Sequence, residues 1–179
     1  AERLSRLVND LLDLSAIESG RKQPKHSLFS LPHLVKEVSD SLQTLIRKHD
    51  VKFETQIPED LPEIFADREQ MRQVLINLMD NAIKFNRKDG LVLVRADPDG
   101  LGMTLEVRDS GMGIPEKDLS RIFERFYRVD KGRSRLEGGT GLGLAIVKHI
   151  IEAHQGTVRV ESVSGEGSSF FVFLPHPKR

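Results

Sequence analysis

The chain has 179 residues, of which 38% are hydrophobic, so it can build one domain with a buried core and is not a disordered tail. Lysine and arginine total 27, as do aspartate and glutamate, so no net charge attracts the whole molecule to nucleic acid or to an anionic membrane. The absence of cysteine excludes disulfides and thiolate chemistry, and favours a cytoplasmic location. The apolar runs are far shorter than the roughly 20 residues that cross a bilayer, so we expect no membrane contact by this part of the protein.

The first predicted element is an amphipathic helix over residues 1–19. Its leucines alternate steps of three and four, at Leu4, Leu7, Leu11 and Leu14. Such a seam needs a partner helix, so we expect that a preceding helix is missing and that the chain is a truncated piece. Gly20 ends the helix, and the polar residues after it predict a linker over residues 20–29.

A second helix is predicted to start near Ser30, with Pro32 tolerated in its first turn. Residues 51–55 alternate like a strand, and residues 64–66 form a short extended piece. Asp67 is a candidate N-cap for a helix that runs to about Phe85.

The second half of the chain predicts two hairpins separated by helical segments. Residues 91–96 and 103–108 are expected to pair around a turn, as are residues 157–163 and 169–174. Short helical pieces are expected over 115–126, a basic loop over 127–139 and a helix over 140–155. Because no regular βαβ rhythm is present, the pattern favours a two-layer α/β sandwich with a mixed sheet over a doubly wound fold.

Polar side chains share one face of the helix predicted after Asp67. Asn77, Asn81 and Lys84 lie at positions i, i+4 and i+7, beside an apolar sector, so the amides lie at the rim of a core. Amide oxygens are suitable ligands for Mg²⁺, which shares its shell with water and phosphate oxygens, and Lys84 could contact phosphate. When only the two amides are considered, the alternative is that both asparagines lie on a solvated helix edge.

A glycine-bearing turn directly follows the strand predicted at 103–108. Asp109 is followed by Gly111 and Gly113, which permit positive φ and close ligand approach. An ionised carboxylate only accepts hydrogen bonds, so Asp109 suits an exocyclic amine such as that of adenine better than a phosphate. The alternative is that Asp109 merely caps its own turn through a local hydrogen bond.

A second glycine-rich segment, residues 138–144, leads into the helix predicted at 140–155. Backbone N–H groups at a helix start can bind phosphate. The segment lacks the Lys-Ser/Thr ending of a P-loop and does not follow a strand, so neither of the two common glycine motifs applies. The preceding loop offers local positive charge from Arg125, Arg128, Lys131, Arg133 and Arg135, although a merely solvated loop is the alternative.

Taken in order, these motifs resemble the ATP-binding domain of sensor histidine kinases, of the Bergerat-fold superfamily that includes the Hsp90 and gyrase ATPases. The resemblance rests on Asn77 and Asn81, Asp109-x-Gly111-x-Gly113, Phe123-x-x-Phe126 and Gly139-x-Gly141-x-Gly143. It covers a catalytic domain over residues 30–175, followed by a tail at 176–179. Residues 1–19 look like the second helix of that family's dimerisation and phosphoacceptor domain.

The resemblance implies a mixed sheet covered on one face by helices, with ATP and Mg²⁺ bound between the amide-bearing helix and a mobile lid. By similarity, Asn81 is the main metal ligand, Asn77 a second ligand or phosphate contact, and Lys84 and Arg128 phosphate contacts. Asp109 would accept from the adenine amine beside Phe85. The remaining cofactor-binding residues would be Gly111, Gly113, Ile114, Phe126, Gly139, Thr140, Gly141, Leu142 and Gly143, with Phe123 and Phe126 anchoring the lid.

The resemblance also implies phosphate transfer to a histidine. Related ATPases place a water-activating glutamate four residues before the metal-binding asparagine, where this chain has Asn77, whose amide cannot take a proton. None of the six histidines lies in the family's acceptor motif, so we expect that this fragment cannot phosphorylate itself.

Several partners follow from the resemblance. They are the acceptor-histidine helix of the protein's own dimerisation domain and the receiver domain of a response regulator, in a homodimeric, membrane-anchored parent that binds no nucleic acid. The alternatives are an ATP-hydrolysing clamp of the same superfamily and a nucleotide-dependent interaction module without phosphotransfer.

Overall fold

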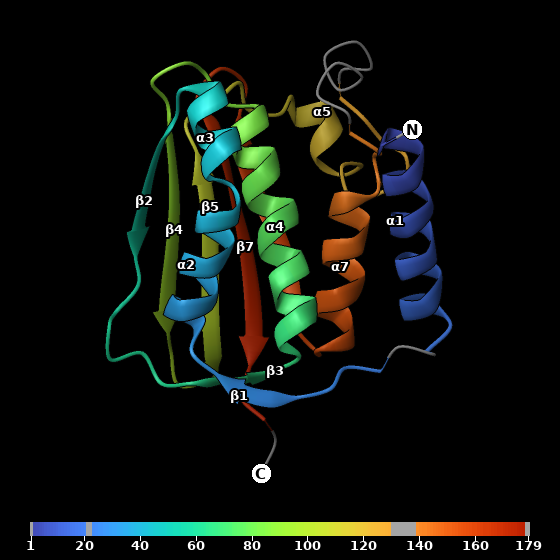
Figure 1. The fold of residues 1–179 in the computed structure, drawn as a ribbon, viewed down its shortest axis with the longest axis vertical. Helices are drawn as coiled ribbons and strands as arrows, with labels where there is room; N and C mark the ends of the chain where they lie inside the picture. The colour runs from blue at the N-terminus through green and yellow to red at the C-terminus, as the bar shows by residue number, and fades with distance from the viewer. Residues whose placement is uncertain (1, 21–22, 130–138, 178–179) are drawn as a thin grey trace.

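The computed structural model describes residues 2–20, 23–129 and 139–177 (Figure 1). The helices are α1 (Glu2–Glu18), α2 (Leu31–Ser41), α3 (Gln43–His49), α4 (Arg68–Lys84), α5 (Glu116–Leu119) and α7 (Gly143–Ala153). The strands are β1 (Ser27–Phe29), β2 (Lys52–Gln56), β3 (Ile64–Ala66), β4 (Leu91–Pro98), β5 (Gly102–Asp109), β6 (Thr157–Val163) and β7 (Gly167–Pro175). No helix in these ranges is long and apolar enough to cross a membrane.

The main sheet has the order β2-β4-β5-β7-β6, in which β2 and β4 are parallel and the other neighbours are antiparallel. Figure 1 shows α2, α3, α4 and α7 across one face of this sheet. The predicted mixed sheet with helices on one face is therefore confirmed. Its core lies between the two layers, where α4, α7, β4, β5 and β7 bury most of their apolar side chains.

The structure differs from the sequence-based expectation in two short regions. Residues 27–29, predicted as linker, form β1, which pairs antiparallel with β3 in a separate two-stranded sheet. The helix predicted from Ser30 does start at that N-cap, but it is divided at Leu42 into α2 and α3.

Helix α4 begins where the sequence predicts. The side chain of Asp67 accepts a hydrogen bond from the backbone N–H of Gln70 at 3.0 Å, which satisfies one of the free amides of the first turn. Glu69 in the first turn and Lys84 in the last turn have the charges that a helix dipole favours. The buried side of α4 packs toward the sheet, so the helix is held in one rotation and its polar residues keep a defined direction.

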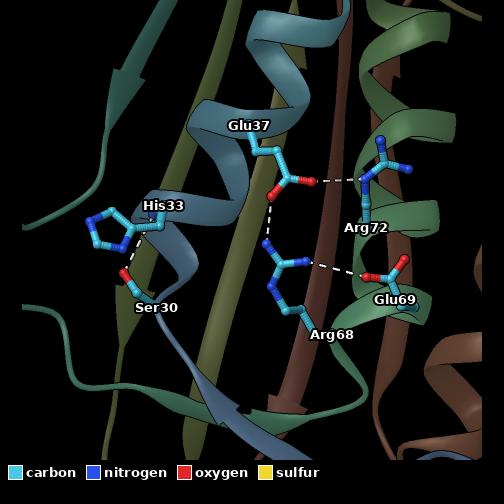
Figure 2. Close-up of polar contacts among 6 residues, drawn as sticks. All are labelled: Ser30, His33, Glu37, Arg68, Glu69 and Arg72. Atoms are coloured by element: carbon cyan, nitrogen blue, oxygen red, sulfur yellow. Dashed lines mark hydrogen bonds and ion pairs between the residues drawn. The ribbon is translucent and has the colours of Figure 1, made fainter.

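Ion pairs connect α2 to α4 on the solvent side (Figure 2). Glu37 accepts from Arg68 at 2.5 Å and from Arg72 at 3.1 Å. These two hydrogen bonds lower the pKa of the Glu37 carboxyl. Because the three side chains remain partly exposed to solvent, the pairs contribute little to stability.

Helix α1 lies beside α7, as Figure 1 shows. Leu14 is 1% exposed and joins the core, whereas Leu4 and Leu12 are 67% and 63% exposed. The leucine seam predicted from the sequence is thus only partly covered by the described residues of this chain.

Candidate functional site

A cavity of about 480 Å³ lies between α4, the segment after β5 and the residues that precede α7. Its walls combine the polar side of α4 with the ends of β5 and β7, and α1 adds Asp10. The predicted site residues on its walls are Asn77, Asn81, Phe85, Asp109, Gly113, Ile114, Arg128, Thr140, Gly141 and Gly143. The sequence motifs, which are far apart in the chain, therefore lie around one cavity.

Five predicted site residues are not on the walls: Lys84, Gly111, Phe126, Gly139 and Leu142. Leu142 is instead fully buried in the hydrophobic core. The predicted lid cations Lys131, Arg133 and Arg135 lie outside the described residues.

The two amides of α4, Asn77 and Asn81, line the cavity. The Asn77 Nδ2 atom is buried without a hydrogen-bond partner among the described residues. A Cβ on Gly143 would lie 3.2 Å from Asn77 Oδ1, so the glycine at the start of α7 allows close packing on this amide. An amide held in place with an unused donor is suited to a ligand oxygen, such as that of a phosphate.

Lys84 takes a different position from the one expected. Its Nζ donates to Asp80 Oδ2 at 2.6 Å, and its side chain is only 10% exposed. Asp80, which the sequence analysis did not select, lines the cavity instead. A phosphate contact by Lys84 stays a prediction, and it requires the ammonium group to leave Asp80.

The side-chain oxygens on the cavity walls suit Mg²⁺ as part of a nucleotide complex. Asn77, Asn81, Asp80 and Asp10 bring neutral and charged oxygens to the same cavity. Among the described residues, no three or more histidine and carboxylate side chains cluster as a metal site. A hard cation here would therefore need phosphate and water oxygens to complete its shell.

Asp109 lies at the end of β5 and lines the same cavity as the α4 amides. Its side chain is 8% exposed, and its Oδ1 accepts from the Gly111 backbone N–H at 2.8 Å. Burial raises the pKa of this carboxyl to about 6, although hydrogen bonds from the Gly111 and Ser168 backbones act in the opposite direction. The local turn bond and the cavity position occur together, so the two interpretations of Asp109 are compatible.

The glycines of the first turn serve backbone packing. A Cβ on Gly111 would lie 2.3 Å from the carbonyl oxygen of Phe85, and one on Gly113 2.0 Å from that of Val163. Gly111 thus allows the turn to pack against the end of α4. A Cβ on Gly111 would also lie 2.8 Å from Asp109 Oδ1, and the expectation that this glycine allows a ligand to approach closely stays a prediction.

A backbone hydrogen bond joins the residues on either side of the segment predicted as the lid. Phe126 N–H donates to Gly141 O at 2.8 Å, and both residues have positive φ. The Phe126 side chain is 56% exposed, and its role in anchoring the lid stays a prediction. Phe123 does pack inward, with its ring edge against Phe170 at 6.3 Å between centroids.

Other wall residues were missed because they lie outside recognisable motifs. Tyr127 donates to Asp118 at 2.5 Å, and the Arg121 guanidinium lies 4.3 Å from its ring. Met112 and Ser168 also line the cavity. Strand register could have found Ser168, because its position in the closing hairpin pairs it with Asp109.

Comparisons with known proteins agree with this geometry. A sequence profile of the family described as histidine kinase-, DNA gyrase B-, and HSP90-like ATPase matches residues 66–178. The sensor protein kinase WalK of Staphylococcus saprophyticus is 40% identical over 184 residues, covering 97% of this chain and 28% of WalK. The circadian input-output histidine kinase CikA of Synechococcus elongatus is 38% identical, covering 97% of this chain and 23% of CikA. The chain thus spans about a quarter of the length of these curated relatives.

Solved structures are similar as well. The catalytic domain of histidine kinase ThkA has a TM-score of 0.74 at 33% identity, covering 86% of this chain and 99% of that domain. Full-length ShkA in complex with AMPPNP has a TM-score of 0.84 at 30% identity, covering 98% of this chain and 37% of ShkA. ThkA in complex with the response regulator protein TrrA has a TM-score of 0.78 at 27% identity, covering 99% of this chain and 49% of that one.

Proposed function

Because the chain belongs to the family of histidine kinase-, DNA gyrase B- and HSP90-like ATPases and contains a histidine kinase ATP-binding domain, we propose that it binds Mg-ATP and transfers the γ-phosphate to a histidine. The observation that carries this proposal is the single cavity with two α4 amides on one wall and the buried Asp109 on another. Each wall suits a different end of a nucleotide.

The adenine end would lie at Asp109. The buried carboxylate can accept a further hydrogen bond, and the adenine amine supplies a donor where guanine has a carbonyl. Phe85, Met112 and Ile114 offer apolar surface beside it.

The phosphate end would lie at Asn77 and Asn81. We propose Asn81 as the main Mg²⁺ ligand and Asn77 as a second ligand or phosphate contact, with Arg128 and the amides near Thr140, Gly141 and Gly143 facing the phosphates. When bound, Mg²⁺ would neutralise part of the negative charge of the phosphates. The chain's own residues align the nucleotide and leave its γ-phosphate open to a nucleophile.

Direct water attack has no evident base at the position that related ATPases use. The residue there is Asn77, an amide, and the nearby Asp80 carboxylate is held by Lys84. Positioned ATP should therefore wait for another nucleophile.

That nucleophile would come from elsewhere. None of the six histidines, all of which lie in the described ranges, lines the cavity. We propose that α1 is the second helix of a dimerisation domain whose first helix carries the acceptor, in a homodimeric parent. A response regulator would receive the phosphate, by analogy with the complex of ThkA and its response regulator protein TrrA. We also propose that this part of the protein lies in the cytoplasm and that the parent protein is anchored in a membrane.

The test mixes the chain with a separately produced acceptor-helix domain and follows the γ-phosphate of labelled ATP. We expect label on the acceptor domain and none on this chain alone. Asn81→Ala should abolish transfer, whereas Asn9→Ala, an exposed asparagine on α1, should not change it. Label on the isolated chain would contradict the proposal, and steady phosphate release without an acceptor would favour an ATP-hydrolysing clamp.

A further inference from the structure

Three polar side chains lie in one row across the main sheet, at the adenine end of the cavity. Strand register pairs Asp109 of β5 with Ser168 of β7, and Ser168 with Ser162 of β6. Asp109 and Ser168 line the cavity and are 8% and 7% exposed, whereas Ser162 lies behind them and does not reach the cavity.

The hydrogen bonds of Ser162 determine the direction in which its single hydroxyl proton points. Ser162 Oγ accepts from the Ile114 backbone N–H at 2.8 Å and lies 2.7 Å from the carbonyl oxygen of Gly167. A carbonyl oxygen carries no proton, and two oxygens approach this closely only with a proton between them. Ser162 therefore donates its proton to Gly167.

The proton of Ser168 is determined in turn. Ser168 Oγ lies 2.9 Å from Ser162 Oγ, and this contact also needs a proton. Since the Ser162 proton is already used for Gly167, Ser168 supplies it and points its O–H away from the cavity. What Ser168 Oγ leaves for a ligand is its lone pairs, so it acts as an acceptor.

We infer that Ser162 is a positioning residue for base selection, because it makes Ser168 a second hydrogen-bond acceptor beside Asp109 at the base-binding end of the cavity. An adenine amine has two N–H donors and can satisfy two acceptors. A 6-oxopurine presents a carbonyl oxygen there and would face two acceptors without a donor. Ser162 thus favours adenine over 6-oxopurine nucleotides without touching either of them.

The inference rests on the proposed nucleotide site, and its test uses ADP and IDP, which carry the same phosphates. Calorimetry on the full chain gives the ratio of the IDP to the ADP dissociation constant. In Ser162→Ala, the Ser168 hydroxyl can rotate and donate to a carbonyl, so this ratio should fall about tenfold. Ser162→Thr keeps a hydroxyl at the same place and should restore the ratio.

A matched control comes from the same hairpin. Ser169 is adjacent to Ser168 in β7, so its side chain points to the opposite face of the sheet. Ser169→Ala should leave the ratio unchanged. A ratio in Ser162→Ala within twofold of the wild-type value would overturn the inference.

A second variant covers the case in which Ser162→Ala does not fold. Ser168→Ala preserves the bonds from Ser162 to Ile114 and Gly167 but removes the acceptor. It should weaken ADP about fivefold to tenfold and leave IDP unchanged. Equal loss for both nucleotides would refute the role of Ser168 as an acceptor. If wild-type protein bound no ADP, the proposed function would fail; if ADP bound with no change in the ratio, only this inference would fail.

Discussion

Asp109 combines two properties that normally oppose each other, burial and negative charge. Its carboxylate accepts hydrogen bonds from the backbone N–H groups of Gly111 and Ser168, and burial raises its pKa to about 6. The ionised form is therefore poorly stabilised until a ligand donor reaches it. A buried acceptor of this kind gives base selection, because a wrong ligand group leaves it unpaired.

This gives a pH prediction for base binding. A raised pKa means that Asp109 is protonated below about pH 6 and ionised above it, so binding of an amine donor should strengthen as the pH rises through 6. Adenosine is the suitable probe because it has no titrating phosphate. We expect its affinity at pH 7 to exceed that at pH 5 about tenfold, measured by calorimetry.

The control for this prediction is Asp109→Asn. The amide can turn a donor toward the adenine amine, so affinity at pH 7 should fall about tenfold or more and lose its pH dependence. The same pH profile in wild type and variant would show that another group titrates.

At the scale of elements, an ion pair within α4 determines which charge faces the cavity. Asp80 holds Lys84 at 2.6 Å, so an acid faces the proposed phosphates while the cation is turned aside. This arrangement disfavours free nucleotide and suits one that carries a divalent cation.

Asp80→Asn should therefore strengthen ADP binding in the absence of Mg²⁺, by about fivefold, because it removes a negative charge and releases Lys84. Titrations in EDTA measure this effect. The matched control is Asp40→Asn, which breaks the equivalent i, i+4 pair with Lys36 on the exposed side of α2. Equal affinities of wild type and Asp80→Asn in EDTA would show that Lys84 does not reach the nucleotide.

The elements also show what sequence predicts well. Helix α4 and the two long hairpins follow from apolar periodicity and caps, which act locally, so Asp67 and the strand pairs were predicted. Strand β1 was not predicted, because its three residues are too few to show a period, and their pairing with β3 depends on a distant part of the chain. Gly111 has the same limit: its contact with the Phe85 carbonyl exists only once β5 and α4 are packed.

On the scale of the whole molecule, α1 packs along α7 and is joined to the rest of the chain by a buried leucine and several polar contacts. Leu14 is buried, Thr140 donates to Asp10 at 2.8 Å and Gln73 donates to Asp13 at 3.1 Å. The first of these polar contacts lies on the cavity, so the N-terminal helix contributes directly to the proposed nucleotide site.

Leu14→Ala should loosen this docking. Removing a buried leucine costs about 2 to 5 kcal/mol, and the loss should appear mainly as faster amide hydrogen exchange in α1. Leu12→Ala is the matched control, since Leu12 is 63% exposed on the same helix and should change exchange little. Slow exchange in both variants would mean that α1 is held by its polar contacts instead.

Nucleotide binding should stabilise the whole molecule, because the cavity joins α4, β5, β7 and the start of α7. At one hundred times its dissociation constant, a ligand adds about 2.7 kcal/mol, which corresponds to a rise of roughly 5 to 10 °C in Tm. We expect ADP with Mg²⁺ to produce such a rise in calorimetric melts, and EDTA to remove much of it. Asn81→Ala should keep the part that survives in EDTA and lose the part that depends on Mg²⁺, because the adenine end is unchanged. If the variant retained the full Mg²⁺-dependent rise, the cation would be held by other oxygens of the cavity, and Asp80 would be the first to test.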